Sequence, residues 1–269
     1  MLENWLNYLN VIRNEGGIVM SEHWDMYFGY IDDKLASIVL DMAIWQEIDT
    51  EKFNHCFCIR LKLKEPNQDG FPIGQESDQI NEMEDAILDF LNHKNFINVG
   101  TVTSNGVRDM IFYSDQESKN ALMEAAEQFV RPTSYEFEVF KIEEDETWEF
   151  YDEFLYPNQY QQQHMGNQQV VISLEEAGDP LDVPRKVEHW LYFSDLKMMK
   201  RFMKEIKKER FSIEEKSKQV DEDGKYSVTI SRTDSVDHHS INEVTDLLVE
   251  ISEKYEGEYD GWETFVIKG

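Results

Sequence analysis

The sequence predicts an α+β protein made of two ferredoxin-like (βαββαβ) α/β sandwich domains, the first with extra flanking strands. Two observations lead to this fold class. Residues 57–64, FCIRLKLK, alternate strictly between apolar and polar side chains, which is typical of a half-buried strand. The same order of strand-like and helical segments then occurs twice, first from Phe57 and again from Arg185.

The first predicted domain, residues 21–158, opens with a hairpin that turns near Asp32-Asp33. After the strand described above, apolar residues at helical spacing predict a helix over residues 77–94. Two strand-like runs are then joined around Asn105-Gly106, a strong local hairpin signal. The remaining predicted elements are a helix over 116–131, a strand over 135–142 and an added edge strand over 148–157.

A polar, glutamine-rich stretch over residues 159–180 predicts a linker. The second predicted domain, residues 181–269, repeats the order of elements. These are a strand over 185–193, a helix over 194–209, strands over 211–220 and 225–233, a helix over 240–255 and a strand over 261–267. Ahead of both domains, residues 1–20 form a predicted appendage that is either a short amphipathic helix or a segment preceding an alternative start at Met20.

The net charge of the chain limits the classes of partner that it can bind. It carries 55 acids and 26 bases, a formal net charge of −29, and both halves are acidic: residues 1–158 hold 32 acids and 11 bases. Because neither half has an excess of positive charge to meet phosphates, direct nucleic-acid binding and binding to an acidic membrane surface are disfavoured. Solubility alone or a basic protein partner explains such a charge.

The two cysteines, Cys56 and Cys58, bear on the compartment. At i and i+2 of a strand they point the same way and are poorly placed for a disulfide, which predicts reduced thiols. The first residues lack the basic region and continuous apolar core of a signal peptide, and no apolar run is long enough to span a membrane. We therefore expect a cytoplasmic protein.

The sequence contains none of the common motifs for catalysis or metal binding that we compared with it. The acidic loop DEDG, residues 221–224, fails as a calcium loop because Ile230 stands where the bidentate acid belongs. His238 and His239 are adjacent, without a second ligand cluster. The chain has no GxSxG, phosphate loop or GxGxxG. We predict that the protein is not an enzyme and holds no cofactor or metal.

The strand over residues 185–193 has two distinct faces. His189 falls on the face expected to pack against helices, where a core histidine is favoured over a ligand. Trp190 and Tyr192 fall on the other face, which a ferredoxin-like domain leaves open. Two such rings also occur on RNA-recognition platforms, but the acidic charge favours another domain or a protein partner here.

The segment KYEGEYDGWET, residues 254–264, follows the last predicted helix. Gly257 is expected to supply a left-handed helix cap, and Gly261 a bulge or a close backbone approach at the start of the final strand. Two interpretations of Tyr259 and Trp262 remain open. They either cover the end of the second core or form a surface recognition site, because aromatic rings beside an acid make good interface anchors.

Two resemblances to known families rest on quoted segments. Residues 183–267, from PRKVEHWLYF to KYEGEYDGWET, resemble the regulator of ribonuclease E activity B family. Its final Y-D-G-W falls here on Tyr259, Asp260, Gly261 and Trp262. Residues 22–157 are similar to the bacterial domain of unknown function 695 family, through HWDMYFGYIDDKLASIVLDM, TSNGVRDMIFY and WEFYDEFLYP.

The first resemblance implies a small acidic cytosolic protein that binds an RNA-degrading endonuclease and restrains it without chemistry; the second implies no function. We therefore predict a non-enzymatic acidic regulator that binds and inhibits such an endonuclease or another basic protein. The predicted contacts are Tyr259, Asp260, Gly261, Trp262, Trp190 and Tyr192. The alternative is an enzyme, or a small-ligand or metal-binding protein, with a site between the two domains that uses carboxylates and His189 or His238.

Overall fold

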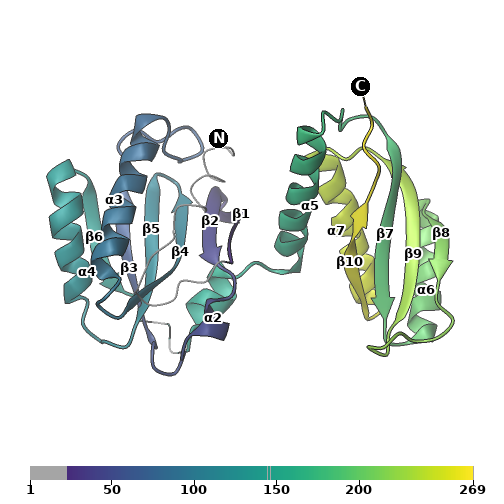
Figure 1. Ribbon diagram of the computed structural model, residues 1–269, viewed down its shortest axis with the longest axis horizontal. Coiled ribbons are helices and arrows are strands. Elements are labelled where there is room, and N and C mark those ends of the chain that lie inside the picture. The colour runs from purple at the N-terminus through teal and green to yellow at the C-terminus, as the bar shows by residue number, and fades with distance from the viewer. Residues whose placement is uncertain (1–22, 144, 146, 269) are drawn as a thin grey trace. The chain divides into compact units, whose positions relative to one another are not determined.

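The computed structural model describes residues 23–143, 145 and 147–268; the appendage predicted over residues 1–20 lies outside this part. The chain divides after Pro157 into two compact units, each built around an antiparallel sheet (Figure 1). The predicted α+β class, with one sheet in each unit, is therefore confirmed.

The first unit holds a six-stranded sheet in the order β1-β2-β4-β5-β3-β6. All neighbouring strands are antiparallel. The strands are β1 (Trp24–Ile31), β2 (Lys34–Asp41), β3 (His55–Lys62), β4 (Phe96–Ser104), β5 (Val107–Ser114) and β6 (Glu136–Lys141), and the helices are α2 (Ile44–Glu47), α3 (Gln75–Leu91) and α4 (Asn120–Ala125).

Both hairpins predicted for this unit are confirmed. Asp32 and Asp33 join β1 to β2 with φ angles of +48° and +60°. Asn105 and Gly106 join β4 to β5 with φ angles of +49° and +79°. Two consecutive residues with positive φ give a tight turn whose twist matches that of the flanking strands, and Asn, Asp and Gly tolerate this conformation best.

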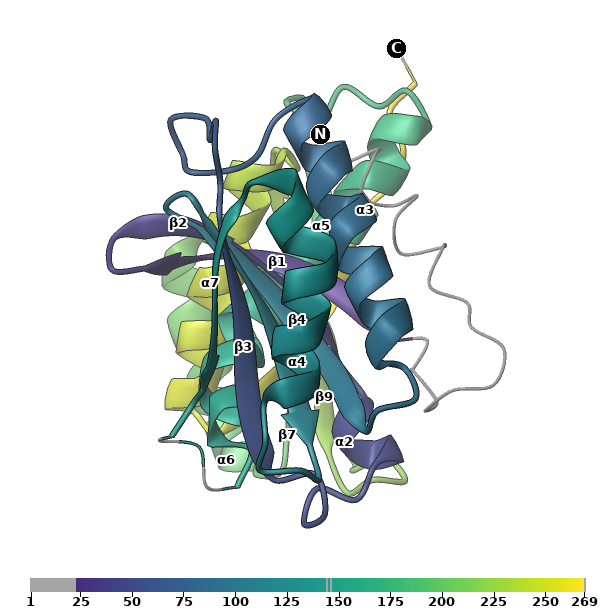
Figure 2. The same ribbon diagram turned by 90° about the vertical axis from the view of Figure 1, so that its left-hand side faces the viewer.

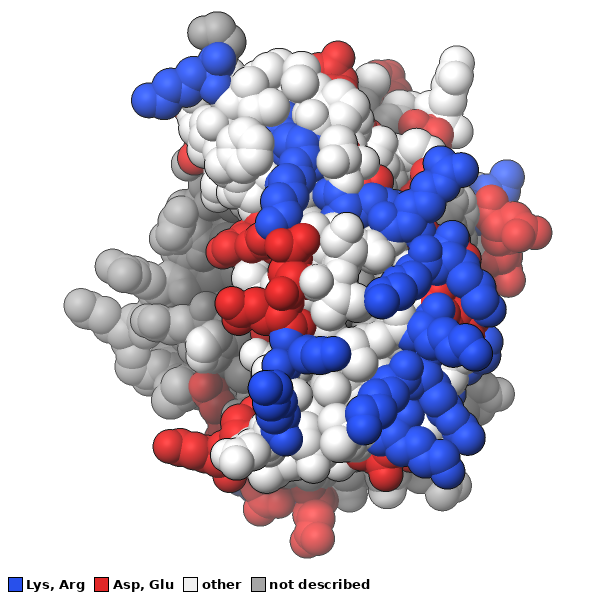
Figure 3. Space-filling model, turned by 90° about the vertical axis from the view of Figure 1, so that its right-hand side faces the viewer, with Lys and Arg blue, Asp and Glu red and all other residues white. Residues whose placement is uncertain are grey.

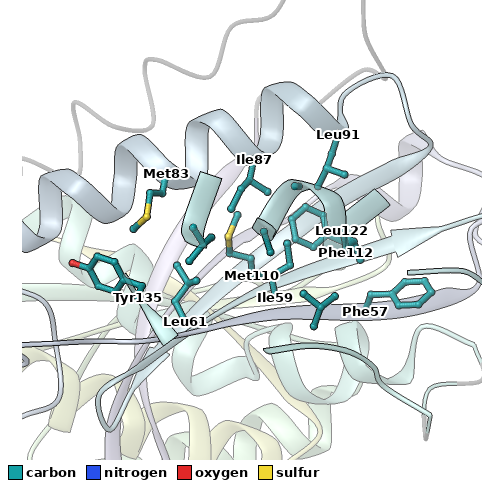
Figure 4. Packing of buried hydrophobic residues seen from close by; sticks show 14 of the residues in the cluster. Phe57, Ile59, Leu61, Met83, Ile87, Leu91, Met110, Phe112, Leu122 and Tyr135 are labelled. Carbon is teal, nitrogen blue, oxygen red and sulfur yellow. The ribbon is translucent and has the colours of Figure 1, made fainter. Parts of the chain in front are cut away.

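Helices α3 and α4 lie side by side over one face of the first sheet (Figure 2). The buried side of α3 carries Ile80, Ile87 and Leu91 at helical spacing, as predicted. They pack against apolar side chains that alternate along β3 and β5 (Figure 4). Each fully buried side chain of this size contributes about 2 kcal/mol through removal from water, so this layer is the main core of the unit.

The opposite face of the first sheet is also covered, which corrects the edge strand predicted over residues 148–157. This segment forms a turn of π-type helix over Phe150–Leu155. Tyr151 and Leu155 lie one turn apart and are fully buried. The Trp148 indole N–H donates to the Phe53 carbonyl at 2.7 Å. Aromatic-rich sequence suits a strand as well as a buried helical turn, and tertiary packing decides between them here.

The second unit holds a four-stranded antiparallel sheet in the order β10-β7-β9-β8. Its last strand begins before the predicted Gly261 and ends at Glu263. The strands are β7 (Arg185–Phe193), β8 (Ser212–Lys216), β9 (Tyr226–Asp234) and β10 (Gly257–Glu263), and the helices are α5 (Gln159–Glu176), α6 (Leu196–Ile206) and α7 (His238–Lys254).

The linker predicted over residues 159–180 is wrong for most of its length, because α5 occupies it. A reciprocal capping box begins the helix: the side chain of Asn158 accepts from the Gln161 backbone N–H, and the Gln161 side chain accepts from the Asn158 N–H. Val171 and Leu174 are buried in a cluster with residues of β7, α7 and β10. A mostly polar helix is thus held by a few apolar side chains and by its cap.

Candidate interaction surface

Strand β7 separates the two faces of the second sheet. Its odd-numbered apolar residues are buried against α5, α6 and α7, whereas Glu188, Trp190 and Tyr192 are half-buried on the other side. Ser227 and Thr229 of β9 stand beside Tyr192 and Trp190 in the same register. We call this side the open face. In the first unit the corresponding side is covered by the segment around Tyr151.

A bulge in β10 shapes the open face beside Trp190. The register with β7 shifts between Tyr259 and Gly261, so that Gly261 stands opposite Trp190 and Asp260 is the extra residue. Gly261 has φ +148°, a conformation that other residues rarely adopt, and a Cβ added to it would meet nothing within 4 Å. The space beside the Trp190 position is therefore not filled from β10.

Carboxylates border the two rings along β10, and on β7 Glu188 is paired with the exposed Lys186 at 2.6 Å. Glu258, Asp260 and Glu263 of β10 are exposed. Glu258 stands opposite Tyr192 and forms an ion pair with Lys225 at 2.5 Å, and Glu263 stands opposite Glu188. An aromatic centre with an acidic rim suits a Lys- or Arg-bearing segment, because a cation is attracted both by carboxylates and by the face of an aromatic ring.

Tyr259 and Trp262 of the Y-D-G-W segment lie in the core, each only 8 % exposed. The Trp262 indole N–H donates to Asn167 Oδ1 of α5 at 2.8 Å. Asn167 in turn donates to Asn242 and Thr245 of α7, both at 2.8 Å. Trp262 thereby ties β10, α5 and α7 together. Only Asp260 and Gly261 of this segment reach the surface.

The backbone conformation shows the roles of Gly257 and Gly261. The left-handed residue that ends α7 is Glu256, with φ +55°, rather than the predicted Gly257. Gly257 is instead required by close packing, because a Cβ there would lie 2.2 Å from Cε1 of Phe193. The predicted bulge at Gly261 is confirmed.

His189 is a fully buried core residue, as predicted. Its Nδ1 lies 2.9 Å from the Tyr259 hydroxyl, and its Nε2 has no hydrogen-bond partner within the described residues. Burial, with a smaller contribution from the positive charge of Arg232, lowers the pKa of His189 to about 3. The imidazole is therefore neutral at physiological pH.

The first unit contains two features that sequence reasoning missed. Glu84 of α3 accepts from Arg108 Nε at 2.9 Å and from Thr101 Oγ1 at 2.6 Å, and all three residues are buried. A cavity of about 260 Å³ lies nearby, with Phe28, Phe71 and Thr103 among the residues that line it. Periodicity places such residues on a face, but it does not reveal which of them meet.

A third missed feature is a basic surface on α6 of the second unit. Summing charge over half of the chain hid it, whereas the local run KMMKRFMKEIKKER is visible in the sequence. Figure 3 shows a run of Lys and Arg side chains on this side of the second unit.

In residues 23–143, 145 and 147–268, no group of three or more His, Cys, Asp and Glu side chains is placed to hold a metal ion. The helices of the same residues include none that is long and apolar enough to cross a membrane.

Family models match both units. The model of a family of unknown function, DUF695, matches residues 22–156, and that of the family named regulator of ribonuclease activity B matches residues 164–264. No curated protein matches the chain.

Two solved structures are similar at low scores. One is described as a candidate glycine cleavage system transcriptional repressor, with 10 % identity, 78 % of this chain and 98 % of that chain covered, and a TM-score of 0.23. The other is an unknown protein from Galdieria sulphuraria, with 9 % identity, coverages of 79 % and 99 %, and a TM-score of 0.21. The chain belongs to the DUF695 family, and its second unit matches the family of regulators of ribonuclease activity B.

Proposed function

We propose that this protein is a non-enzymatic regulator that binds a ribonuclease, or another basic protein, through the open face of its second unit. The observation that carries the proposal is the pair of half-buried rings, Trp190 and Tyr192, in the middle of a sheet face bordered by acids. The match to regulators of ribonuclease activity supports the choice of partner. We further propose that it acts in the cytoplasm.

The chemistry of the open face favours a basic protein segment. Large rings at the centre of an interface contribute most of its affinity, and a Lys or Arg side chain placed over Trp190 would gain both from the ring and from the acidic rim. A Cβ added to Gly261 would meet nothing within 4 Å, so β10 places no side chain next to the Trp190 position. Inhibition would then follow from occlusion of the partner, and the net charge of −29 would speed the encounter at low salt.

Trp190 and Tyr192, rather than Tyr259 and Trp262, are the predicted contacts that we retain as anchors. The buried rings of the Y-D-G-W segment position β10 and its bulge, so their role is indirect. Asp260 and Gly261 take part as an exposed acid and as the residue that leaves space.

We also infer that both units have the ferredoxin-like arrangement. Counting strands from β3 and from β7 in the βαββαβ order, each sheet runs 4-1-3-2, and the first adds the β1–β2 hairpin beside β4. This arrangement supports an open face in the second unit, because both helices of a βαββαβ unit lie on the same side of its sheet.

The test uses the full chain and a purified RNA-degrading endonuclease from the source organism. The parent is expected to bind the endonuclease and slow its cleavage of RNA. The double variant Trp190→Ala, Tyr192→Ala should bind at least about tenfold more weakly, since central aromatic anchors contribute about 2 kcal/mol or more. The matched control is Tyr30→Ala, which removes a 78 % exposed ring from the first unit.

Thermal unfolding of each variant separates loss of binding from loss of fold. If the double variant melts like the parent and still binds and inhibits the endonuclease, the open face is not the contact surface. If the parent itself neither binds nor inhibits the endonuclease, the proposed regulation of a ribonuclease is wrong.

A second candidate function is the binding of a small apolar ligand by the first unit. The cavity lined by Phe28, Phe71 and Thr103 supports it, because Phe28 is 48 % exposed at this site. A fluorescent apolar dye should bind the full chain, and Ser37→Phe, which fills the cavity, should abolish the signal. An unchanged signal in Ser37→Phe would place the dye elsewhere.

A further inference from the structure

Helix α6 and the turn after it carry a concentrated positive charge in a strongly acidic protein. Between residues 195 and 210 there are seven basic and three acidic residues. All seven basic side chains are exposed: Lys197, Lys200, Arg201, Lys204, Lys207, Lys208 and Arg210. We call these residues the basic face.

The spacing of the basic face follows from how α6 is packed. Met199, Phe202 and Ile206 recur at helical spacing and are buried in the second core. The Lys and Arg residues between them therefore project from the opposite, outward side of the helix. Cations that recur about every turn form a row along the helix, with roughly 5.4 Å between successive turns.

The cations of the basic face form no close ion pairs, although the charge of Lys208 acts on Glu205 and contributes to lowering its pKa. In the part of the chain that the structure describes, none of the seven belongs to an ion pair. Glu205, the one acid inside α6, pairs with Lys254 of α7 at 2.7 Å instead. Lys200 and Lys204 are like charges at i and i+4, an arrangement that destabilises a helix. An acid at either position would remove this repulsion, and acids are common in the chain, which has 55 of them. The two lysines are therefore not explained by the stability of the helix.

The chemistry of the row favours a phosphate backbone over an acidic protein. Protein interfaces are built on apolar and aromatic centres and are depleted in lysine. Five of the seven cations are lysines, and the apolar residues of α6 face inward. Lysine is a compact, mobile charge that neutralises phosphate without reading sequence.

We propose that the basic face binds single-stranded RNA through its phosphates. The choice of RNA over DNA rests on the proposed function, since the substrate of a regulated ribonuclease is RNA. This inference revises the expectation from half-chain charge that direct nucleic-acid binding is unlikely. The remaining acidic surface keeps the affinity weak and strongly dependent on salt.

The experiment measures fluorescence anisotropy of a labelled poly-uridine strand with the full chain. Four phosphate contacts on a single strand give a salt exponent of about −2.8, so raising the salt from about 50 mM to about 200 mM should weaken binding roughly 50-fold. The variant Lys200→Glu, Lys204→Glu, Lys208→Glu should lose at least about tenfold in affinity. Its charge-matched control is Lys34→Glu, Lys52→Glu, Lys62→Glu, at exposed lysines of the first unit.

The outcomes separate the possible sources of a signal. Loss in the α6 variant with binding retained in the control supports the proposal. Equal losses in both variants would make binding a matter of net charge and overturn it, as would absence of RNA binding by the parent at low salt. A parent that binds poly-glutamate but not RNA would assign the face to an acidic protein. Preference for a DNA strand over RNA would refute the choice of RNA. Because this assay contains no ribonuclease, its failure leaves the test of the open face unaffected.

Discussion

Replacing Trp262 with Phe tests whether the Y-D-G-W segment is primarily structural. Only 8 % of the surface of Trp262 is exposed, so replacing its indole with a smaller ring leaves a buried cavity. Such a cavity costs about 1–2 kcal/mol of unfolding free energy. Loss of the N–H bond to Asn167 adds about 1 kcal/mol. The penalty stays moderate because Asn167 Oδ1 still accepts from Gln163 at 3.0 Å. We expect Trp262→Phe to destabilise the second unit by about 2–3 kcal/mol.

A double-mutant cycle isolates the hydrogen bond from the cavity. Trp262→Phe, Asn167→Ala and the double variant are unfolded with urea in the full chain and followed by far-ultraviolet circular dichroism. The coupling free energy between the two positions should be about 1 kcal/mol. The control cycle pairs Trp262→Phe with Ser173→Ala at an exposed position of α5 and should be additive within about 0.4 kcal/mol.

The reasoning fails if the Trp262–Asn167 coupling lies within the error of the control cycle. It also fails if Trp262→Phe unfolds with the parent's midpoint, because the ring would then not be part of the core. A variant that keeps its stability but loses the ribonuclease would instead make Trp262 a direct contact. The experiment thus separates the two roles that the sequence leaves open for this residue.

Two further predictions concern buried ionisable side chains. Arg108→Met should destabilise the first unit by about 3–5 kcal/mol, because Glu84 would stay buried without its cation. Urea unfolding compares this single variant with the double variant Arg108→Met, Glu84→Gln, which should be more stable. Equal unfolding midpoints for the single and double variants would contradict the prediction. His189 has a pKa of about 3 when folded against 6.5 ordinarily, so the unfolded state binds more protons between these values and the stability of the second unit falls as the pH is lowered from 6.5. The contribution of His189 to this fall should approach about 1.4 kcal/mol per pH unit and be missing in His189→Gln, whose remaining slope comes from carboxyl groups with lowered pKa, such as Asp179 and Asp237. An identical pH slope for parent and variant would refute the prediction.

Local patterns predicted most of the sheet and helix positions, because one face of each element is apolar. The strict alternation of residues 57–64 and the spacing of Ile80, Ile87 and Leu91 translate directly into burial. The two hairpins followed from turn chemistry at Asp32-Asp33 and Asn105-Gly106. These are the elements whose local preference agrees with the tertiary structure.

The prediction of residues 148–180 failed for a physical reason. Aromatic residues of the segment around Tyr151 pack as a helical turn, although their preference is for strands. Helix α5 has a weak apolar face, since one of its main anchors is the polar Asn167. The capping box of Asn158 and Gln161 was the local signal that could have identified it.

The candidate site was predicted in part. Alternation alone assigned His189 and Trp190 to opposite faces of β7, and the structure agrees. Whether Tyr259 and Trp262 are buried could not be read locally, because burial depends on where α5 and β7 meet β10. The bulge between Tyr259 and Gly261 turns Trp262 onto the core side, so that one short segment serves both faces.

The open face and the basic face lie on opposite sides of the same sheet, since α6 packs on the side of Leu191 and Phe193. Neither surface can cover the other, so a protein on Trp190 and an RNA strand on α6 could bind at the same time. A regulator of this design would hold RNA near the nuclease that it restrains, rather than compete with RNA for a single surface. Saturating poly-uridine should then leave the affinity for the ribonuclease unchanged or higher, whereas competition between the two would mean that they share a surface.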